Sequence, residues 1–249
     1  MMYKIFSITF LCLFCLIGVS ALSINRFMDP YNFVLSNNTN FIGAANERII
    51  KSAFLNKNKK TYDSVLIGSS RSSYIDVSKS KTNKMFNYSV SGISIDEYLP
   101  YLRHYQATQS NPKIIILSLD FHGTNQNFDN SVNQADVFSK SNSKFKQYVE
   151  YIKVKTAHQS LNMLKPNRKE FGDFYTRDMI KKRKDQETGL TDAIISGTLD
   201  YYKVYCLSDY SYRNDYKHKL SEIRDAFPDA KIIVLICPVH ESLDRKSVV

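Results

Sequence analysis

Two runs of consecutive apolar residues constrain the possible folds of this chain more than any other feature. Ile114-Ile115-Ile116-Leu117 and Ile232-Ile233-Val234-Leu235-Ile236 contain no alternating polar positions. Strands without such alternation are covered on both faces, which is typical of a parallel sheet between two layers of helices. With two shorter runs, the sequence predicts strands at 64–68, 85–90, 113–119 and 230–237. We therefore expect an α/β fold with a parallel sheet.

Helices are predicted between these strands. Ser94 and Glu97 have the spacing of a capping box, and Pro100 predicts an irregular first turn. An apolar stripe at helical spacing precedes the last strand and consists of Tyr212, Tyr216, Leu220, Ile223 and Phe227. The long insertion at about 121–208 is predicted to be helical at 145–164 and 192–206 and to form a cap over the strand ends.

The first residues predict where the chain is located. Ile5–Ile24 is an uncharged apolar run that is long enough to cross a bilayer as a helix, and only Lys4 and the terminal amine precede it. This arrangement favours an amino terminus inside the cell and a body outside the cytoplasmic membrane. Val19-Ser20-Ala21 also fits a signal-peptidase site, so cleavage near Ala21 followed by secretion is the alternative. We expect an anchor at 1–25, a lead-in at 26–62 and one domain at 63–249.

The net charge of +10 comes from Lys and Arg spread along the chain, with a dense basic patch at Lys181-Lys182-Arg183-Lys184. A basic exterior suits an anionic envelope polymer or a lipid surface. Nucleic acid is not expected as a partner, because an exported domain without a binding motif gives no support for it. Outside the membrane segment the only cysteines are Cys206 and Cys237, which cannot form a disulfide framework, and Cys237 is predicted to be a buried thiol.

The histidines outside the strand ends give no sign of a metal site. His104, His158 and His218 lie in predicted helices among Lys and Tyr residues, and we expect them on the surface. Nothing in the chain has the spacing of metal ligands. We therefore expect neither a metal nor another cofactor.

Polar groups follow each predicted strand. Ser69, Ser70 and Arg71 follow the first, Gly92 follows the second, Asp120–Asn125 follow the third, and His240 follows the fourth. Ligands of open parallel sheets bind beyond the carboxyl ends of the strands. Acyl transfer needs a hydroxyl nucleophile, a base and N–H donors for the oxyanion, and this set contains all three. Gly68-Ser69-Ser70 taken alone also fits a Ser-rich turn without chemistry.

This ordered set resembles the SGNH hydrolase-like superfamily, in particular its membrane-anchored bacterial branch related to the alginate O-acetylation proteins and the D-alanyl transfer protein of teichoic acid synthesis. The resemblance covers roughly residues 29–240. It implies a flavodoxin-like, three-layer α/β/α fold with Ser70 as nucleophile and His240 as base. It also implies that Gly92 and Asn125 form the oxyanion hole. A helix normally follows the last strand of this fold, so the chain, which stops at Val249, is expected to be truncated or to lack that helix.

The last block departs from the family pattern. The family has Asp-x-x-His, whereas this chain has Cys237-Pro-Val-His240, so the acid that would orient the histidine is missing. Glu241, Asp244 or Asp120 could replace it, a Ser–His pair could suffice, or the fold could be non-catalytic. Cys237 is not expected to be the nucleophile, because it precedes a proline inside an apolar strand.

Arg71 and Asp120 are predicted to bind substrate, with the guanidinium of Arg71 holding a carboxylate or phosphate. The alternative is that Arg71 pairs with Asp76 or Asp120 and braces the strand ends. The resemblance implies a membrane-anchored, extracytoplasmic esterase or O-acyltransferase that acts on an anionic or acylated envelope polysaccharide. The alternative function is a non-catalytic accessory that binds polymer and other membrane proteins in a polysaccharide modification or export complex.

Overall fold

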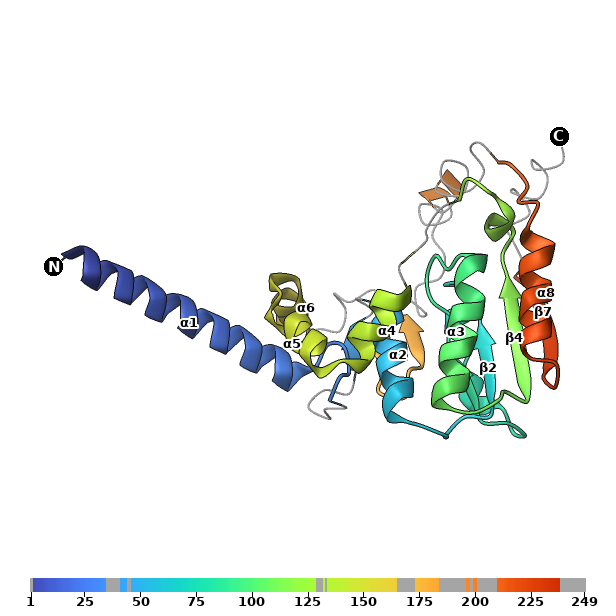
Figure 1. Ribbon diagram of the computed structural model, residues 1–249, viewed down its shortest axis with the longest axis horizontal. Helices are drawn as coiled ribbons and strands as arrows, with labels where there is room; N and C mark the ends of the chain where they lie inside the picture. The colour runs from blue at the N-terminus through green and yellow to red at the C-terminus, as the bar shows by residue number, and fades with distance from the viewer. Residues whose placement is uncertain are drawn as a thin grey trace. The chain divides into compact units, whose positions relative to one another are not determined.

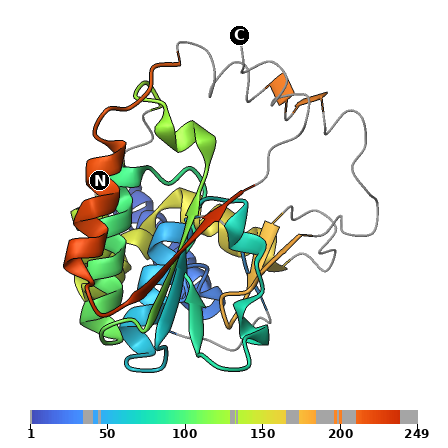
Figure 2. The same cartoon turned by 90° about the vertical axis from the view of Figure 1, so that its right-hand side faces the viewer.

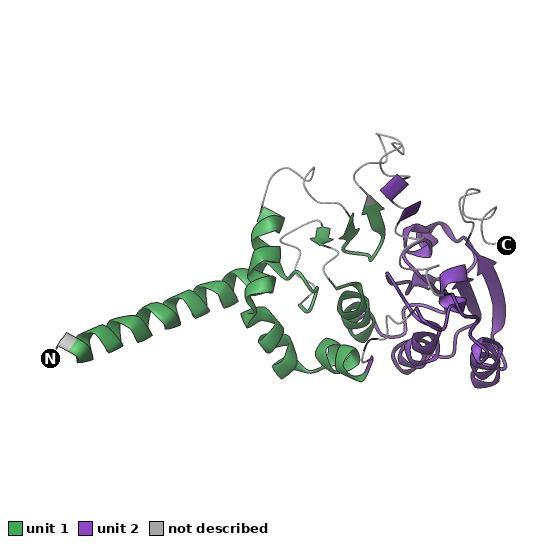
Figure 3. Cartoon of the chain, turned by 90° about the horizontal axis from the view of Figure 1, so that it is seen from above, with its two compact units in different colours: residues 1–57, 135–184 green, residues 58–134, 185–249 purple. Residues whose placement is uncertain are grey.

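The computed structural model describes residues 2–34, 41–43, 46–128, 132, 134–164, 173–183, 196–197, 199–200 and 210–237. The chain divides into two compact units (Figure 3). Unit 1 comprises residues 1–57 and 135–184, and unit 2 comprises residues 58–134 and 185–249. Most of the helix predicted at 192–206 lies outside the described residues, as do Cys206 and His240.

Unit 2 contains the predicted parallel sheet (Figure 1). Its strands are β2 (Ser64–Ile67), β3 (Met85–Asn87), β4 (Ile114–Leu119) and β7 (Lys231–Ile236), in the order β3-β2-β4-β7. The pairing with β2 continues beyond the last residue of β3. The N–H of Tyr88 donates to the carbonyl oxygen of Leu66 at 2.7 Å, and that of Val90 donates to the carbonyl oxygen of Gly68 at 2.9 Å. Since all pairs are parallel, the carboxyl ends of the strands lie at one edge.

Two α-helices of unit 2, α3 (Ile95–Thr108) and α8 (Tyr216–Ala226), pack against each other (Figure 2). The predicted capping box is present at the start of α3, where the backbone N–H of Ser94 donates to Glu97 Oε1 at 3.1 Å. The helix continues through Pro100. Of the predicted stripe in α8, Ile223 is fully buried, whereas Tyr212 is exposed and precedes the helix.

The prediction of cover on both faces agrees with β4, in which every residue is buried or half-buried. It is wrong for β7, where Val234 and Ile236 are 52% and 77% exposed. Among the described residues of unit 2, no second layer of α-helices is seen on the sheet. The structure therefore shows an α/β unit with a parallel sheet, and the three-layer arrangement stays a prediction.

Unit 1 begins with the apolar helix α1 (Met2–Met28). The stretch Tyr3–Met28 is long and apolar enough to cross a membrane, with a mean hydropathy of 2.5 over its most apolar 18 residues. The last turn differs from the rest of the helix, because Asn25 and Met28 are buried. The helix α1 therefore runs directly into the packed part of unit 1.

The rest of unit 1 combines lead-in and insertion. A three-stranded antiparallel sheet has the order β1 (Phe41–Gly43), β5 (Asp173–Thr176) and β6 (Lys181–Arg183). Its helices are α2 (Glu47–Lys57), α4 (Gln134–Asn142), α5 (Lys144–Ile152) and α6 (Val154–Leu164). The helix predicted at 145–164 is thus two helices, which are separated at Lys153. The sequence analysis did not predict β1, β5 or β6.

The predicted basic patch is not a continuous exposed surface. Lys181 is buried, and its Nζ lies 2.7 Å from Glu47 Oε1 and 3.2 Å from Asp173 Oδ2. Lys51 is also buried, with its Nζ 5.1 Å from the centre of the Tyr175 ring, and burial lowers the pKa of Lys51 to about 7. These lysines hold α2 against the small sheet and do not face an outside partner.

The prediction that His104 lies on the surface is wrong. It lies half-buried in α3, with its Nδ1 2.9 Å from the hydroxyl oxygen of Tyr88. Burial disfavours the charged imidazolium and lowers the pKa of His104 from 6.5 to about 4. The folded protein therefore holds this imidazole neutral above a pH of about 4.

The half-buried imidazole of His104 predicts that the free energy of unfolding decreases in acid. Because the pKa of His104 is lower in the folded state, stability is fully present above pH 6.5 and is lost as the pH falls toward 4. Lowering the pH from 7 to 5 should reduce the free energy of unfolding by about 2 kcal/mol through this group. Urea unfolding of the full chain followed by circular dichroism measures the loss. His104→Gln should lose less over this interval, whereas the exposed-site control His158→Gln should match the wild type. Equal losses in all three would contradict the prediction.

Candidate functional site

Ser70 lies in a tight turn directly after β2. The backbone N–H of Ser73 and the Oγ of Ser72 both donate to the carbonyl oxygen of Ser69, each at 3.1 Å. The Oγ of Ser73 donates to the carbonyl oxygen of Ser70 at 2.6 Å. The side chain of Ser70 is partly exposed, and no hydrogen bond to its Oγ comes from the residues that the structure describes. The turn therefore fixes the backbone of Ser70 and leaves its hydroxyl available.

Hydrogen bonds from the neighbouring strand β3 hold this turn in place. Asn87, the last residue of β3, donates from Nδ2 to the carbonyl oxygens of Ser72 at 2.8 Å and Ile75 at 3.0 Å. Ser89 adds a second contact, because its Oγ lies within hydrogen-bond distance of Ser72 Oγ, at 2.9 Å. The short 3-10 helix η1 (Ser72–Tyr74) is thereby held against the end of β3. The sequence analysis did not assign this role to Asn87, although an amide in a largely apolar strand was a visible signal.

Gly68 sets the position of the turn. A Cβ atom at this residue would lie 2.5 Å from Ser118 Cβ and 2.8 Å from the Ser118 carbonyl oxygen, and it would also collide with Ser72 Oγ. Only glycine allows β2 to pass β4 this closely before the chain turns.

Gly92 lies just beyond the neighbouring strand β3, at the same edge of the sheet. Its φ of 61° falls in the left-handed region that favours glycine. The residue is partly exposed. Its conformation fits the predicted oxyanion role, and its contact with an oxyanion stays a prediction.

The structure brings the two predicted substrate-binding residues together. Arg71 Nη1 lies 3.3 Å from Asp120 Oδ1, and the side chains are 20% and 3% exposed. The guanidinium also lies 5.9 Å from the centre of the Phe121 ring. Asp76, the other predicted partner of Arg71, accepts a hydrogen bond from the backbone N–H of Ser78 at 3.2 Å. Arg71 and Asp120 thus link the ends of β2 and β4.

Asn125 is buried after the 3-10 helix η3 (Phe121–Thr124). Its Oδ1 accepts hydrogen bonds from the backbone N–H groups of Asn127 and Ser211, each at 3.1 Å. Its backbone also forms an isolated antiparallel bridge with Tyr212. Asn125 therefore joins the loop after β4 to the segment before α8, and its oxyanion role stays a prediction.

The last strand directs the chain to the same edge. The backbone N–H of Cys237 donates to the carbonyl oxygen of Leu119 at 3.2 Å, and its Sγ lies 3.1 Å from Ser118 Oγ. The predicted buried thiol is confirmed, and burial raises the pKa of the Cys237 thiol, which disfavours a thiolate nucleophile. His240, Glu241 and Asp244 lie outside the described residues, so the Ser70–His240 pair is still a prediction.

His122 is a further candidate that the sequence analysis did not single out. It is buried in η3, and its ring packs edge-on against Phe128 at a centroid distance of 4.9 Å. Burial lowers the pKa of His122, while the charge of Asp120 acts in the opposite direction and that of Arg71 adds to the lowering. A neutral imidazole therefore lies close to the Arg71–Asp120 pair. Its position two residues beyond Asp120 was the available signal.

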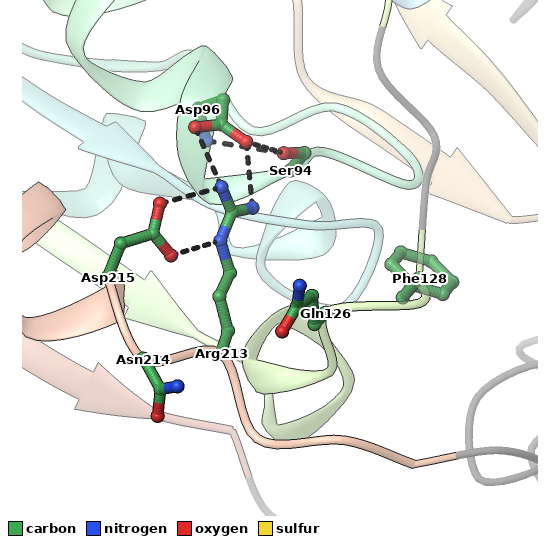
Figure 4. A pocket seen from close by; sticks show the side chains of 7 residues that line it. All are labelled: Ser94, Asp96, Gln126, Phe128, Arg213, Asn214 and Asp215. Atoms are coloured by element: carbon green, nitrogen blue, oxygen red, sulfur yellow. Dashed lines mark hydrogen bonds and ion pairs between the residues drawn. The ribbon is translucent and has the colours of Figure 1, made fainter.

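An open pocket lies beside Asn125 in unit 2 (Figure 4). Its volume is about 540 Å³, and it is lined by Ser94, Asp96, Gln126, Phe128, Arg213, Asn214 and Asp215. Arg213 is held between two carboxylates, with Nη1 2.7 Å from Asp96 Oδ2 and Nε 2.7 Å from Asp215 Oδ1. The hydrogen bonds to Asp215 and Asp96 raise the pKa of Arg213. The pocket therefore surrounds the charge-compensated guanidinium of Arg213 with hydroxyl, amide and aromatic side chains.

The fold and the site define an α/β protein with a parallel sheet, whose polar groups gather beyond the carboxyl ends of the strands. Comparisons of the chain with models of protein families, with curated proteins and with solved structures give no match.

Gly68→Ala should destabilise the protein, because the added methyl group collides with Ser118 and Ser72. We expect a loss of about 2 kcal/mol and a lower midpoint of thermal unfolding, measured by circular dichroism on the full chain in detergent. Gly123→Ala is the matched control, since a Cβ there meets nothing within 4 Å. Equal midpoints for the two variants would show that the close approach is not rigid.

The Arg71–Asp120 pair should show strong energetic coupling. Arg71→Met leaves a buried carboxylate without its cation, so we expect a loss of about 2 kcal/mol that Asp120→Asn in the same chain partly restores. A double-mutant cycle by urea unfolding should give a coupling of at least about 1 kcal/mol. The exposed pair Lys113–Asp63, at 3.1 Å, is the control and should give less than about 0.5 kcal/mol. Additive losses at Arg71 and Asp120 would refute the bracing role.

Proposed function

We propose that this chain is a membrane-anchored, extracytoplasmic enzyme that hydrolyses or transfers acyl esters on a cell-envelope glycan, with Ser70 as nucleophile. One observation carries the proposal. Ser70 is partly exposed beyond the carboxyl end of β2, in a turn fixed by Gly68 and Asn87, and none of the described residues hydrogen-bonds to its hydroxyl. Parallel sheets bind their ligands at this edge. The resemblance to SGNH hydrolase-like proteins, with their three-layer fold, is part of the same proposal.

The proposed reaction is a two-step acyl transfer. Ser70 Oγ attacks the acyl carbonyl carbon while His240 takes the hydroxyl proton. The backbone N–H groups of Ser70 and Gly92, with the amide of Asn125, stabilise the oxyanion of the tetrahedral intermediate. The leaving alcohol takes the proton back from His240. Water in an esterase, or a glycan hydroxyl in a transferase, then attacks the acyl-serine and restores Ser70.

The pocket beside Asn125 supports a glycan as the substrate. Its size is in the range of small-molecule sites, and its hydroxyl and amide groups suit the hydroxyls of a sugar. Phe128 adds an aromatic surface. The charge of Arg213 is offset by Asp96 and Asp215, so the pocket favours neutral groups over anions.

The competing accessory function finds less support. It relied on Arg71 and the basic patch to bind an anionic polymer. Arg71 is paired with Asp120, and Lys181 is buried against Glu47. Because these two cations already have anionic partners, recognition through hydroxyl groups is favoured over recognition through charge.

Labelling by an active-site phosphonate tests the nucleophile. The full chain in detergent should react with an alkyl fluorophosphonate, and peptide mapping should place the label on Ser70. Ser70→Ala should abolish labelling, whereas Ser91→Ala, which removes an exposed hydroxyl after the next strand, should retain it. A folded wild-type chain that takes up no label would favour the accessory function.

The same assay distinguishes the two histidines. His240→Ala should slow labelling of Ser70 by a factor of about a hundred or more, because the serine loses its base. His122→Ala should change the rate much less. If Glu241 orients His240, Glu241→Gln should approach the effect of His240→Ala, and if the pair acts alone, Glu241→Gln should be silent. Unchanged labelling in His240→Ala with loss in His122→Ala would transfer the base to His122, and unchanged labelling in both would overturn the Ser–His mechanism.

A further inference from the structure

The helices α5 and α6 carry an apolar face that protein does not cover. It consists of Phe145, Tyr148, Val149, Ile152, Val154, Leu161 and Leu164, all exposed. Phe145, Val149 and Ile152 are spaced by four and three residues on α5, and Val154, Leu161 and Leu164 by seven and three on α6. These spacings place each set along one side of its helix. Exposed fractions of 77% at Phe145 and 86% at Val154 are unusual for a soluble surface.

The opposite side of the two helices is fixed to the end of α1. The Nδ2 of the buried Asn25 donates to the carbonyl oxygen of Tyr151 at 2.5 Å. The hydroxyl of Tyr151 donates to Asp29 Oδ1 at 2.6 Å, just beyond the helix. Met163 of α6 packs with Met28 in a small buried core. Figure 1 shows α5 and α6 beside the carboxyl end of α1.

This attachment fixes the position of α5 and α6 along the axis of α1, and therefore their depth relative to the membrane that α1 is proposed to cross. The apolar run Ile5–Ile24 is about 30 Å long as a helix at 1.5 Å per residue, which matches the hydrocarbon core of a bilayer. Asn25 is the first residue after that run and is also the residue that contacts Tyr151. A helix packed at this point lies at the level of the lipid headgroups.

The charge of the two helices suits the same environment. The segment 144–164 contains Lys144, Lys146, Lys153 and Lys155 against the single acid Glu150, which gives a net charge of +3. Lys153 Nζ lies 2.6 Å from Glu150 Oε1 and Lys146 Nζ lies 3.9 Å from Asp136 Oδ1, so Lys144 and Lys155 are the two whose charge is offered to lipid. Lysines beside an apolar face are typical of helices that lie in the plane of an anionic membrane surface. Tyr148 adds an aromatic side chain of the kind enriched at membrane interfaces.

We propose that α5 and α6 lie in the headgroup layer of the membrane that α1 crosses, with their apolar face toward the acyl chains and their lysines toward anionic lipid. The inference rests on the proposed membrane anchor and is independent of the chemistry at Ser70. In this arrangement unit 1 is bound to the membrane surface as well as to α1, and it does not hang from α1 through a flexible linker.

Tryptophan fluorescence tests the proposal directly, because the chain contains no tryptophan of its own. The full chain is reconstituted into vesicles of phosphatidylcholine and phosphatidylglycerol, with and without lipids brominated on their acyl chains. Single variants are Phe145→Trp and Leu161→Trp on the apolar face, Asp178→Trp in the exposed turn between β5 and β6, and Phe14→Trp within α1. Bromine quenches tryptophan only at close range.

We expect Phe145→Trp and Leu161→Trp to emit at shorter wavelength than Asp178→Trp and to lose about half or more of their fluorescence to lipids brominated near the headgroup. Phe14→Trp should be quenched best by lipids brominated deep in the chain. If Phe14→Trp is quenched while both face variants emit like Asp178→Trp, the interfacial location is refuted and the anchor stands. A short-wavelength emission at Phe145 without quenching would mean that another protein or a second copy covers the face, which also overturns the proposal. Absence of quenching at Phe14 would refute the anchor and this inference together.

Discussion

The close approach of Gly68 to β4 is the constraint on which the candidate site depends. At this point β2 passes so near Ser118 that no side chain fits, and the chain turns directly into the serine-rich segment. Asn87 then fixes the turn from β3 by binding its carbonyl oxygens. Ser70 is thus held through contacts with both strands that flank β2. Such support from rigid elements is what a reactive side chain needs in order to keep one geometry.

Buried charges in both units are compensated within the protein. In unit 2, Asp120 lies almost completely buried beside Arg71, which links two strand ends. In unit 1, Lys181 is buried between Glu47 and Asp173, which joins α2 to the small sheet. Burying an ion without its partner costs several kcal/mol, so these residues are bound to one another before any ligand is considered. The net positive charge of the chain therefore overstates the charge that is available for recognition.

The apolar helix α1 is packed into unit 1 through its last turn. Asn25 and Met28 are buried there. Tyr151 accepts a hydrogen bond from Asn25 in the last turn and donates one to Asp29 just beyond the helix. A helix that ends in a packed core transmits its orientation to that core, whereas one that ends in a flexible linker does not. The position of α5 and α6 relative to the apolar run of α1 follows from this packing.

The sequence by itself determined the features that depend on local periodicity and local hydrogen bonds. These are the four parallel strands, the capping box at Ser94, the apolar helix α1 and the gathering of polar groups at one edge of the sheet. Only the tertiary structure decided that Arg71 pairs with Asp120, that Lys181 lies inside and that His104 is half-buried. The short strands β1, β5 and β6 also escaped the sequence analysis, because three or four residues are too few to show a period. Pairing and burial of this kind depend on segments far apart in the chain, and a local pattern contains no information about which distant segment will cover it.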